Sequence, residues 1–272
     1  MKKIIVALDG LKLSLSGIQT AISLTQKENA HLVGVFLDDF TRNSFSMEDA
    51  IHHNNLKELS EKDQQERDRA VKQFDFHCRE AGVNHAIHRD KSFALPDLMR
   101  ESIYADLLVI SSGETFTRFT EPPPTRFVRD LLGGSECPVM VVPEAYKPFE
   151  KVVMLYDGAP SSVFAIKMFT GILPAINRLP AEVITVKGDE NLHLPENKLM
   201  KEFMKRHNPN AQYTVLTGEP EAAILHRLEQ EKESTLIVLG AYQRNAVSRW
   251  FRSSMADVIQ KHLKCPLFVA HN

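Results

Sequence analysis

The sequence has 272 residues, of which 43% are hydrophobic and 25% charged, and its formal net charge is −2. This length is about twice that of a typical domain and predicts two domains, and the composition is that of a soluble globular protein. The small net charge argues against a general nucleic-acid-binding protein. The three cysteines, Cys78, Cys137 and Cys265, lie far apart without CxxC spacing, which fits a reducing compartment and no disulfide framework.

Apolar runs in this sequence are short. The run near the amino terminus, Ile4–Leu8, ends at Asp9 and is too short for the core of a signal peptide. No segment approaches the roughly 18 consecutive apolar residues of a membrane span. We therefore expect a cytoplasmic protein with neither a membrane nor a nucleic acid among its partners.

Four strand-like segments occur twice, in the same order. KKIIVALDG at residues 2–10 recurs as EKVVMLYDG at 150–158, and each is a β-branched apolar run that ends in Asp-Gly. The other pairs are 30–39 with 181–190, 105–113 with 234–242, and 137–144 with 265–272. Four matched strands in one order predict an internal duplication.

Segments of helical periodicity separate these strands. Helices are predicted at 14–28, 95–105, 161–173 and 220–233, with Ser161 and Ser162 as candidate N-caps of the third. Short apolar strands that alternate with helices predict an α/β fold: two tandem Rossmann-like domains, each a mainly parallel sheet flanked by helices. We place these domains at 1–146 and 147–272, with the linker at Pro143–Glu150. The first domain has a longer polar stretch, Met47–Gly82, which we interpret as a partly solvated helical excursion with an apolar stripe at Leu56, Leu59, Ala70, Val71 and Phe74.

One aspartate follows the first strand of each half, Asp9 in the first and Asp157 in the second. In open parallel sheets, ligands bind beyond the carboxyl ends of the strands, where such a carboxylate can accept hydrogen bonds from a ribose hydroxyl. Asp-Gly is also a common turn pair, in which the aspartate caps its own turn. From the residues alone, the turn is the favoured interpretation of both aspartates over a ribose contact.

Both halves resemble universal stress protein domains. The resemblance is carried by IIVALDG and VVMLYDG, by TGEPEAAI at 217–224 ahead of TLIVLGA, and by the closing segments CPVMVVP and CPLFVA. Tandem pairs of such domains are a known form of this family, which has an adenine-nucleotide α-hydrolase-like fold. The resemblance implies a stress-response protein that acts through ligand sensing or partner binding, without catalysis. It also implies that the two closing strands pair, so that the two domains form a pseudo-dimer within the chain.

Family members that bind ATP carry a glycine, two residues, a second glycine, nine residues, and then Gly-Ser or Gly-Thr. The second half keeps this spacing with Gly240, Gln243, Ser253 and Ser254. Serine hydroxyls at a helix N-terminus can bind an anion. The candidate nucleotide-binding residues are therefore Asp157, Gly240, Gln243, Ser253 and Ser254, and the candidate ligand is ATP or another adenine nucleotide in the second domain.

The first half keeps the spacing without any of the glycines, as Ser111, Glu114, Pro124 and Thr125. Glu114 would place a carboxylate beside the phosphates, and Pro124 has no N–H to donate. We therefore predict that the first domain binds no triphosphate and is a structural or interaction copy.

No catalytic or metal-binding motif is present in the sequence. The 11 histidines have no zinc-site spacing, and His85 and His88 would lie on opposite faces of a strand. Two other functions stay open. One is a weak ATP-hydrolysing enzyme that uses the second-half site, and the other is a scaffold with no ligand, whose contact surface would be Met47–Gly82. Further homo-oligomers or other protein partners also fit the sequence.

Overall fold

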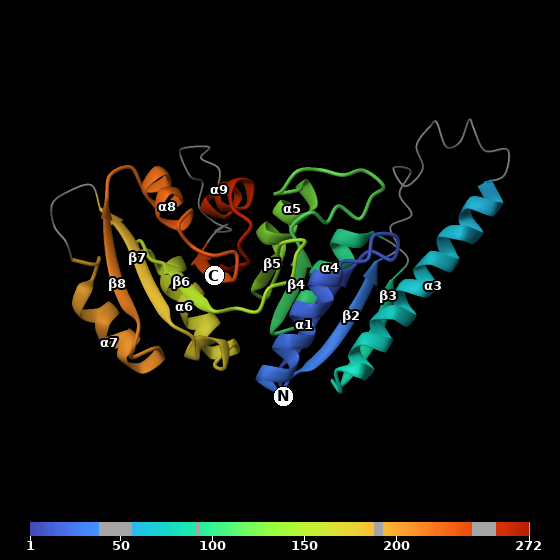
Figure 1. The fold of residues 1–272 in the computed structure, drawn as a ribbon, viewed down its shortest axis with the longest axis horizontal. Coiled ribbons are helices and arrows are strands. Elements are labelled where there is room, and N and C mark those ends of the chain that lie inside the picture. The colour runs from blue at the N-terminus through green and yellow to red at the C-terminus, as the bar shows by residue number, and fades with distance from the viewer. Residues whose placement is uncertain (38–55, 91–92, 188–192, 241–253, 272) are drawn as a thin grey trace. The chain divides into compact units, whose positions relative to one another are not determined.

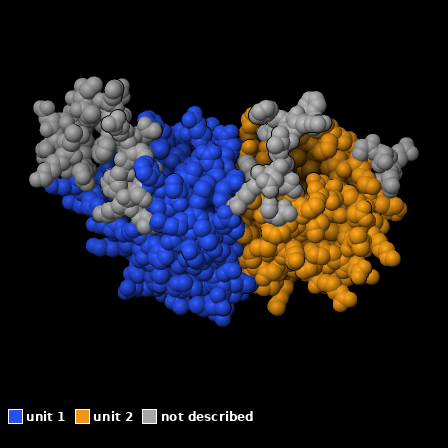
Figure 2. All heavy atoms as spheres, turned by 180° about the vertical axis from the view of Figure 1, so that it is seen from behind, with its two compact units in different colours: residues 1–137 blue, residues 138–272 orange. Residues whose placement is uncertain are grey.

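The structure, a computed structural model, describes residues 1–37, 56–90, 93–187, 193–240 and 254–271 (Figure 1). The side chains of residues 56–60 and 90 are outside this description. The chain divides into two compact units, residues 1–137 (unit 1) and 138–272 (unit 2) (Figure 2). Strands and helices alternate in each unit, so the predicted α/β fold is confirmed.

Unit 1 contains a parallel sheet in the strand order β3-β2-β1-β4. Its strands are β1 (Lys3–Leu8), β2 (His31–Leu37), β3 (His85–Asp90) and β4 (Leu107–Ser111). Its helices are α1 (Leu15–Glu28), α3 (Leu56–Glu80), α4 (Ala94–Ser102) and α5 (Arg126–Gly134). Strands β1 and β4 are almost fully buried, as their apolar sequences predicted.

Unit 2 contains a sheet in the order β5-β10-β9-β6-β7-β8. Its strands are β5 (Val139–Val142), β6 (Lys151–Leu155), β7 (Ala181–Lys187), β8 (Gln212–Thr217), β9 (Thr235–Gly240) and β10 (Leu267–Ala270). Its helices are α6 (Pro160–Ile172), the short 3-10 helix η2 (Ile176–Arg178), α7 (Asn197–His207), α8 (Pro220–Leu228) and α9 (Met255–His262). The strands β10, β9, β6, β7 and β8 run parallel to one another.

The closing strands of the two sequence repeats pair with each other inside unit 2. Strand β5 runs antiparallel to β10, with Val141 opposite Leu267 and Val139 opposite Val269. This pairing is the one that the resemblance implied for CPVMVV and CPLFVA. Residues 143–150, the predicted linker, form neither helix nor strand. The division of the sequence repeat at residues 146 and 147 stays a prediction.

Two details of the helix predictions were wrong. Helix α6 begins at Pro160 with Ala159 as its N-cap residue, ahead of the serines expected to cap it. Proline is well suited to the first helical position because its φ is already helical and it has no N–H to leave unpaired. The Ser162 hydroxyl instead donates to the Ala159 carbonyl at 2.8 Å. Helices α4 and α8 end at Ser102 and Leu228, each short of its predicted end.

The polar excursion of unit 1 contains one long helix, α3, which lies beside β3 (Figure 1). Arg67, Ala70, Phe74 and Cys78 are its buried residues among those described, and they recur at helical spacing. Phe74 stacks edge-on against Phe36 of β2, with ring centroids 5.9 Å apart. The predicted stripe is therefore confirmed at Ala70 and Phe74, whereas Val71 is only half-buried. The buried face of the helix also includes Arg67 and Cys78. Residues 47–55 and the side chains of Leu56 and Leu59 lie outside the described part.

Strands β3 and β8 were harder to predict than the others. Each lies at the end of its strand order, and their sequences, HAIHRD and QYTVLT, mix polar and apolar residues. Strands of this kind carry no continuous apolar run, which was the signal used for the four repeated strands. In the described residues, no helix is long and apolar enough to cross a membrane.

Candidate functional site

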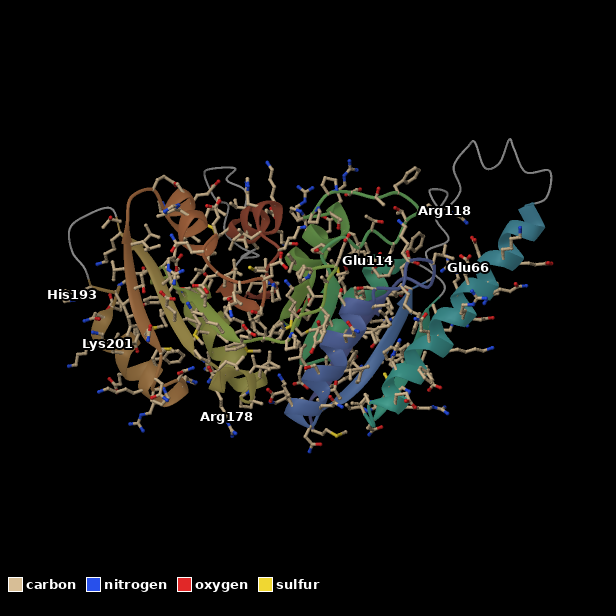
Figure 3. The ribbon with its side chains drawn as sticks, viewed as in Figure 1. Glu66, Glu114, Arg118, Arg178, His193 and Lys201 are labelled. Atoms are coloured by element: carbon tan, nitrogen blue, oxygen red, sulfur yellow. The ribbon has the colours of Figure 1, made fainter. Side chains whose placement is uncertain are left out.

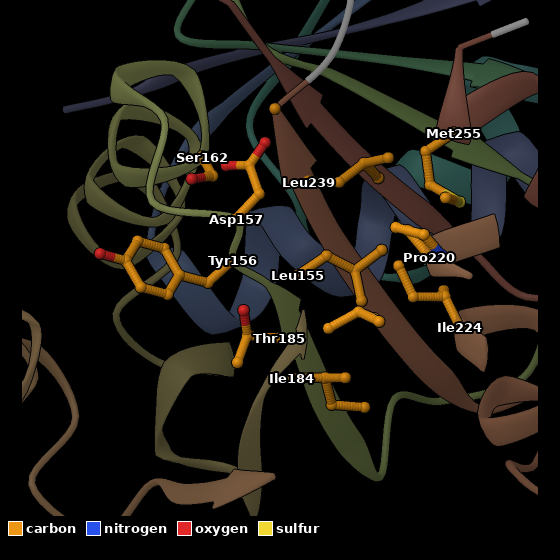
Figure 4. A pocket seen from close by; sticks show the side chains of 12 residues that line it. Leu155, Tyr156, Asp157, Ser162, Ile184, Thr185, Pro220, Ile224, Leu239 and Met255 are labelled. Carbon is orange, nitrogen blue, oxygen red and sulfur yellow. The ribbon is translucent and has the colours of Figure 1, made fainter. Parts of the chain in front are cut away.

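A pocket of about 200 Å³ lies in unit 2 at the carboxyl ends of β6, β7 and β9 (Figure 4). Leu155, Ile184 and Leu239 contribute apolar wall from these strands, and Ile224 contributes more from α8. Polar groups come from Asp157 after β6, from Ser162 on α6 and from Thr185 on β7. The position beyond the carboxyl ends of parallel strands is the one that ligands prefer in this class of sheet.

Asp157 lines this pocket and also caps its own turn. Its Oδ1 accepts a hydrogen bond from the Ala159 N–H at 2.9 Å. Asp9 makes the same bond with the Leu11 N–H at 2.8 Å in unit 1. The turn interpretation of both aspartates is confirmed. Since the bond uses one oxygen of the exposed Asp157 carboxylate, a ligand contact through the other oxygen is compatible with it.

Gly240, at the end of β9, lines the same pocket but has a packing role of its own. A Cβ at this position would lie 2.5 Å from the carbonyl carbon and oxygen of Ser161 and 2.9 Å from the Ser162 nitrogen. These are backbone atoms of the first turn of α6, so a side chain fits only if the helix moves. The fold therefore requires glycine here whether or not a phosphate binds, and its retention in the sequence is by itself weak evidence for a nucleotide.

Ser254 is the N-cap residue of α9. Its Oγ accepts from the Ala256 N–H at 3.4 Å, and the next residue, Met255, lines the pocket. The prediction that the serine pair opens a helix is confirmed at Ser254. Gln243 and Ser253 lie outside the described residues. Of the five predicted residues, the structure thus brings Asp157 and Gly240 into one pocket and places Ser254 beside it.

Three further polar residues line the pocket that were not predicted as site residues: Tyr156, Ser162 and Thr185. The Tyr156 hydroxyl donates to the Pro195 carbonyl at 3.0 Å, and burial raises the pKa of this phenol. A hydroxyl between the apolar residues Ile184 and Val186 of β7 was a usable signal at Thr185. Tyr156 and Ser162 gave no comparable signal, because tyrosine before a turn and serine in a first helical turn are both common.

The corresponding region of unit 1 is nearly filled. Its cavity is about 10 Å³ and is lined by Asp9 and Leu11, by Arg67 from α3 and by Phe116 and Arg118 from the loop after β4. Helix α3 packs so closely that a Cβ on Gly10 would lie 2.9 Å from the Arg67 Cγ. Arg118 also forms an ion pair with Asp63 of α3. The long helix of the excursion therefore helps to close this region.

Glu114 lies buried in the loop that follows β4 (Figure 3). Its Oε1 accepts from the N–H groups of Thr115 and Phe116, both at 2.9 Å. Burial, and next the neighbouring Asp9 carboxylate, raise the pKa of Glu114 to about 7. The loop's own carboxylate thus occupies backbone donors of the kind that cradle a phosphate. This geometry agrees with the prediction that unit 1 binds no triphosphate.

Thr125 closes the other end of the same loop. Its hydroxyl donates to the Glu114 carbonyl at 2.6 Å, and its Oγ1 accepts from the Val128 N–H at 3.2 Å as the N-cap of α5. In the sequence repeat Thr125 stands where Ser254 stands in the second half. Both positions therefore keep a helix cap, and in unit 1 the capping hydroxyl is also bonded to its own loop.

His85 and His88 pair with different carboxylates. His85 Nε2 lies 2.9 Å from an oxygen of Asp75, and His88 Nδ1 lies 2.7 Å from an oxygen of Glu101. Within the described ranges, no three His, Cys, Asp or Glu side chains are grouped as a metal site requires. These histidines belong to separate surface networks.

Comparison with protein families adds a sequence match to this geometry. Residues 177–271 match the universal stress protein family. Over this range the chain is similar to universal stress protein domains. The matched range runs from η2 to β10 of unit 2 and includes Gly240, Ser254 and Thr185, while Asp157 lies before it. The family resemblance seen in the sequence is confirmed for this range.

Solved universal stress proteins share the fold over nearly the whole chain. One from Archaeoglobus fulgidus is 13% identical, with a TM-score of 0.72, and the similarity covers 98% of each chain. A candidate universal stress protein from Pseudomonas aeruginosa is also 13% identical, with a TM-score of 0.61, covering 99% of this chain and 92% of that one. At this identity the likeness shows the fold alone. No curated protein sequence matches the chain.

Proposed function

We propose that this protein is a non-catalytic stress-response protein whose second unit senses an adenine nucleotide or a related anionic ligand. The observation that carries the proposal is the pocket of about 200 Å³ in the universal stress protein domain, bordered by Asp157 and Gly240. Beside it, α9 begins at Ser254, and a helix N-terminus favours a negatively charged group. An apolar enclosure for a base thus lies next to polar groups suited to a sugar and a phosphate.

In this proposal, unit 1 is a structural or interaction copy of the domain. Its counterpart pocket is about 10 Å³, and Glu114 already holds two N–H groups of its loop. The pairing of β5 with β10 supports the further proposal that the two sequence repeats associate within the chain. A cytoplasmic location and further protein partners belong to the proposal as well.

A hydrolase would need more from this site than the described residues supply. Hydrolysis of ATP requires groups that hold a magnesium ion and a base that activates water. Among the described residues, Asp157 is the carboxylate that lines the pocket. The sensor is therefore the function that the described geometry supports best, with the weak hydrolase and the ligand-free scaffold as outcomes of the test.

We expect calorimetric titration of the full chain to show binding of ATP and AMP, and Ser254→Ala to weaken ATP binding about tenfold by removing a hydrogen bond to a charged group. Thr125→Ala is the matched control because it removes the corresponding cap from unit 1. Ser254→Ala should lose about 1 kcal/mol of stability with its cap, and Thr125→Ala should lose more because its hydroxyl also bonds the Glu114 carbonyl. Thr125→Ala should nevertheless bind ATP like the wild type.

Three results would contradict the proposal in different ways. If neither nucleotide produced a heat of binding, the ligand-free scaffold would be the remaining function. Release of phosphate from ATP by the wild type, measured in the same buffer with magnesium, would favour the hydrolase. Equal loss of ATP binding in Ser254→Ala and Thr125→Ala would show that the loss follows from removal of a helix cap and not from a contact between Ser254 and the ligand.

A further inference from the structure

The pocket of unit 2 contains a buried hydroxyl without a partner in the described part of the chain. Thr185 of β7 lines this pocket, and its side chain is 1% exposed. Its Oγ1 is buried and makes no hydrogen bond to any described residue. A threonine hydroxyl can donate one hydrogen bond and accept two, and buried polar groups are nearly always paired. This atom therefore marks a position where a ligand can supply the missing partner.

The strand register shows what replaces this hydroxyl in unit 1. Leu8 pairs with Phe36, whereas Leu155 pairs with Ile184, the residue before Thr185. Because Leu8 and Tyr156 both precede the aspartate of their turn, Thr185 takes the position of Phe36. The sequence repeat had matched Ala30 with Ala181, but in the register Leu32 corresponds to Ala181.

The two residues at this position have opposite surroundings. Phe36 is buried against the ring of Phe74, which comes from α3. An apolar residue with apolar neighbours needs no partner, so unit 1 is complete without a ligand. Thr185 brings a polar atom to the same place in a unit whose pocket is open. Phenylalanine thus occupies this position in the nearly filled unit 1, and threonine occupies it in unit 2, which has the open pocket.

The walls around Thr185 restrict the chemistry of its partner. Leu155, Ile184, Ile224 and Leu239 are apolar, while Asp157 and Ser162 lie together at another part of the lining (Figure 4). A heteroaromatic ring suits such an enclosure, because its faces are apolar and its polar atoms lie at the edge. A sugar or phosphate attached to the ring would meet Asp157 and Ser162.

We propose that Thr185 is a specificity-determining residue of the unit 2 pocket, whose hydroxyl hydrogen-bonds an edge nitrogen or amino group of a bound purine ring. The inference rests on the proposed function of this unit and adds to it the side chain that recognises the base. It requires that ligands without the ring gain nothing from Thr185.

The test uses the full chain, with AMP and ribose 5-phosphate as probes in calorimetry. Thr185→Val keeps the shape of the side chain and removes the hydroxyl, and we expect it to weaken AMP binding about tenfold. Thr185→Ser restores the hydroxyl and should bind AMP within about threefold of the wild type. The affinity for ribose 5-phosphate should be equal in all three proteins, because this probe has no ring.

A measurement without ligand completes the test. If the Thr185 hydroxyl is unpaired in the free protein, Thr185→Val should melt at the same or a higher temperature than the wild type. A lower melting temperature would show that the hydroxyl is already paired and would overturn the inference. Unchanged AMP affinity in Thr185→Val would also overturn it, while the proposed function would stand. Absence of AMP binding in the wild type would overturn both.

Discussion

Glu114→Gln should make the protein more stable than the wild type at pH 8, by up to about 3 kcal/mol, and leave its stability near that of the wild type at pH 4.5. The backbone N–H groups of Thr115 and Phe116 both donate to one carboxylate oxygen of Glu114, Oε1. The amide oxygen of glutamine can accept the same two bonds. The variant therefore removes the ionisation of this side chain and keeps its hydrogen bonds.

The direction of this effect follows from the raised pKa of Glu114. Its folded-state value is about 7 against an ordinary value of 4.5, so the folded state binds the proton more tightly than the unfolded state. Below pH 4.5 the carboxyl is protonated in both states and carries no penalty. Between pH 4.5 and about 7 the unfolded chain has released this proton while the folded protein still holds it, so stability falls as the pH rises. Above about pH 7 the folded protein holds a buried carboxylate beside Asp9, and the loss is complete.

Urea unfolding followed by circular dichroism at several pH values between 4.5 and 8 measures this difference. Glu80→Gln serves as the control because it makes the same charge change at an exposed position of α3. The stability gain of Glu114→Gln over the wild type should grow with pH, and that of Glu80→Gln should not. A gain that is the same at every pH would mean that Glu114 does not titrate in this window.

Gly240→Ala should destabilise unit 2 by about 3 kcal/mol, at the upper end of the range for overpacked sites. The new Cβ would lie 2.5 Å from the Ser161 carbonyl carbon and oxygen. These atoms belong to the backbone at the start of α6, so relief requires a shift of the helix, which cannot be achieved by rotating one side chain. Ligand binding should weaken as well, because Asp157 and Ser162 flank the same region of the pocket.

The matched control for this variant is Gly171→Ala, in α6, the helix that a Cβ at Gly240 would meet. A Cβ at Gly171 would meet nothing within 4 Å, and this position is exposed. Alanine in a helix is favoured over glycine by about 1 kcal/mol, so this variant should be more stable than the wild type. Urea unfolding of both variants identifies the transition of unit 2. A Gly240→Ala protein as stable as the wild type would show that α6 does not approach β9 this closely.

Much of the fold could be predicted from local sequence features. The strands β1, β4, β6 and β9 were predicted because a strand buried on both faces must be apolar throughout. The Asp-Gly turns and the serine at the start of α9 were predicted from equally local chemistry. The edge strands β3 and β8 were not among the repeated strands that were predicted, because each mixes polar with apolar residues.

The candidate site depended more on distant contacts. Gly240 was selected as the remnant of a phosphate loop, yet its absent side chain makes room for α6. Glu114 was expected to repel phosphates, and the structure adds that it binds its own loop. Thr185 had a local sequence signal, but its selection as a candidate rests on its hydroxyl being buried and unpaired among the described residues.

The sequence by itself determined the α/β class, the internal duplication, the difference between the two loops and the family resemblance. These follow from periodicity, turn chemistry and residue spacing, which are properties of short segments. Only the tertiary structure decided that unit 2 has an open pocket while Arg67 and Phe116 line a nearly filled one in unit 1. A cavity is the space that remains after segments far apart in the chain have packed, so no single segment of the sequence contains it.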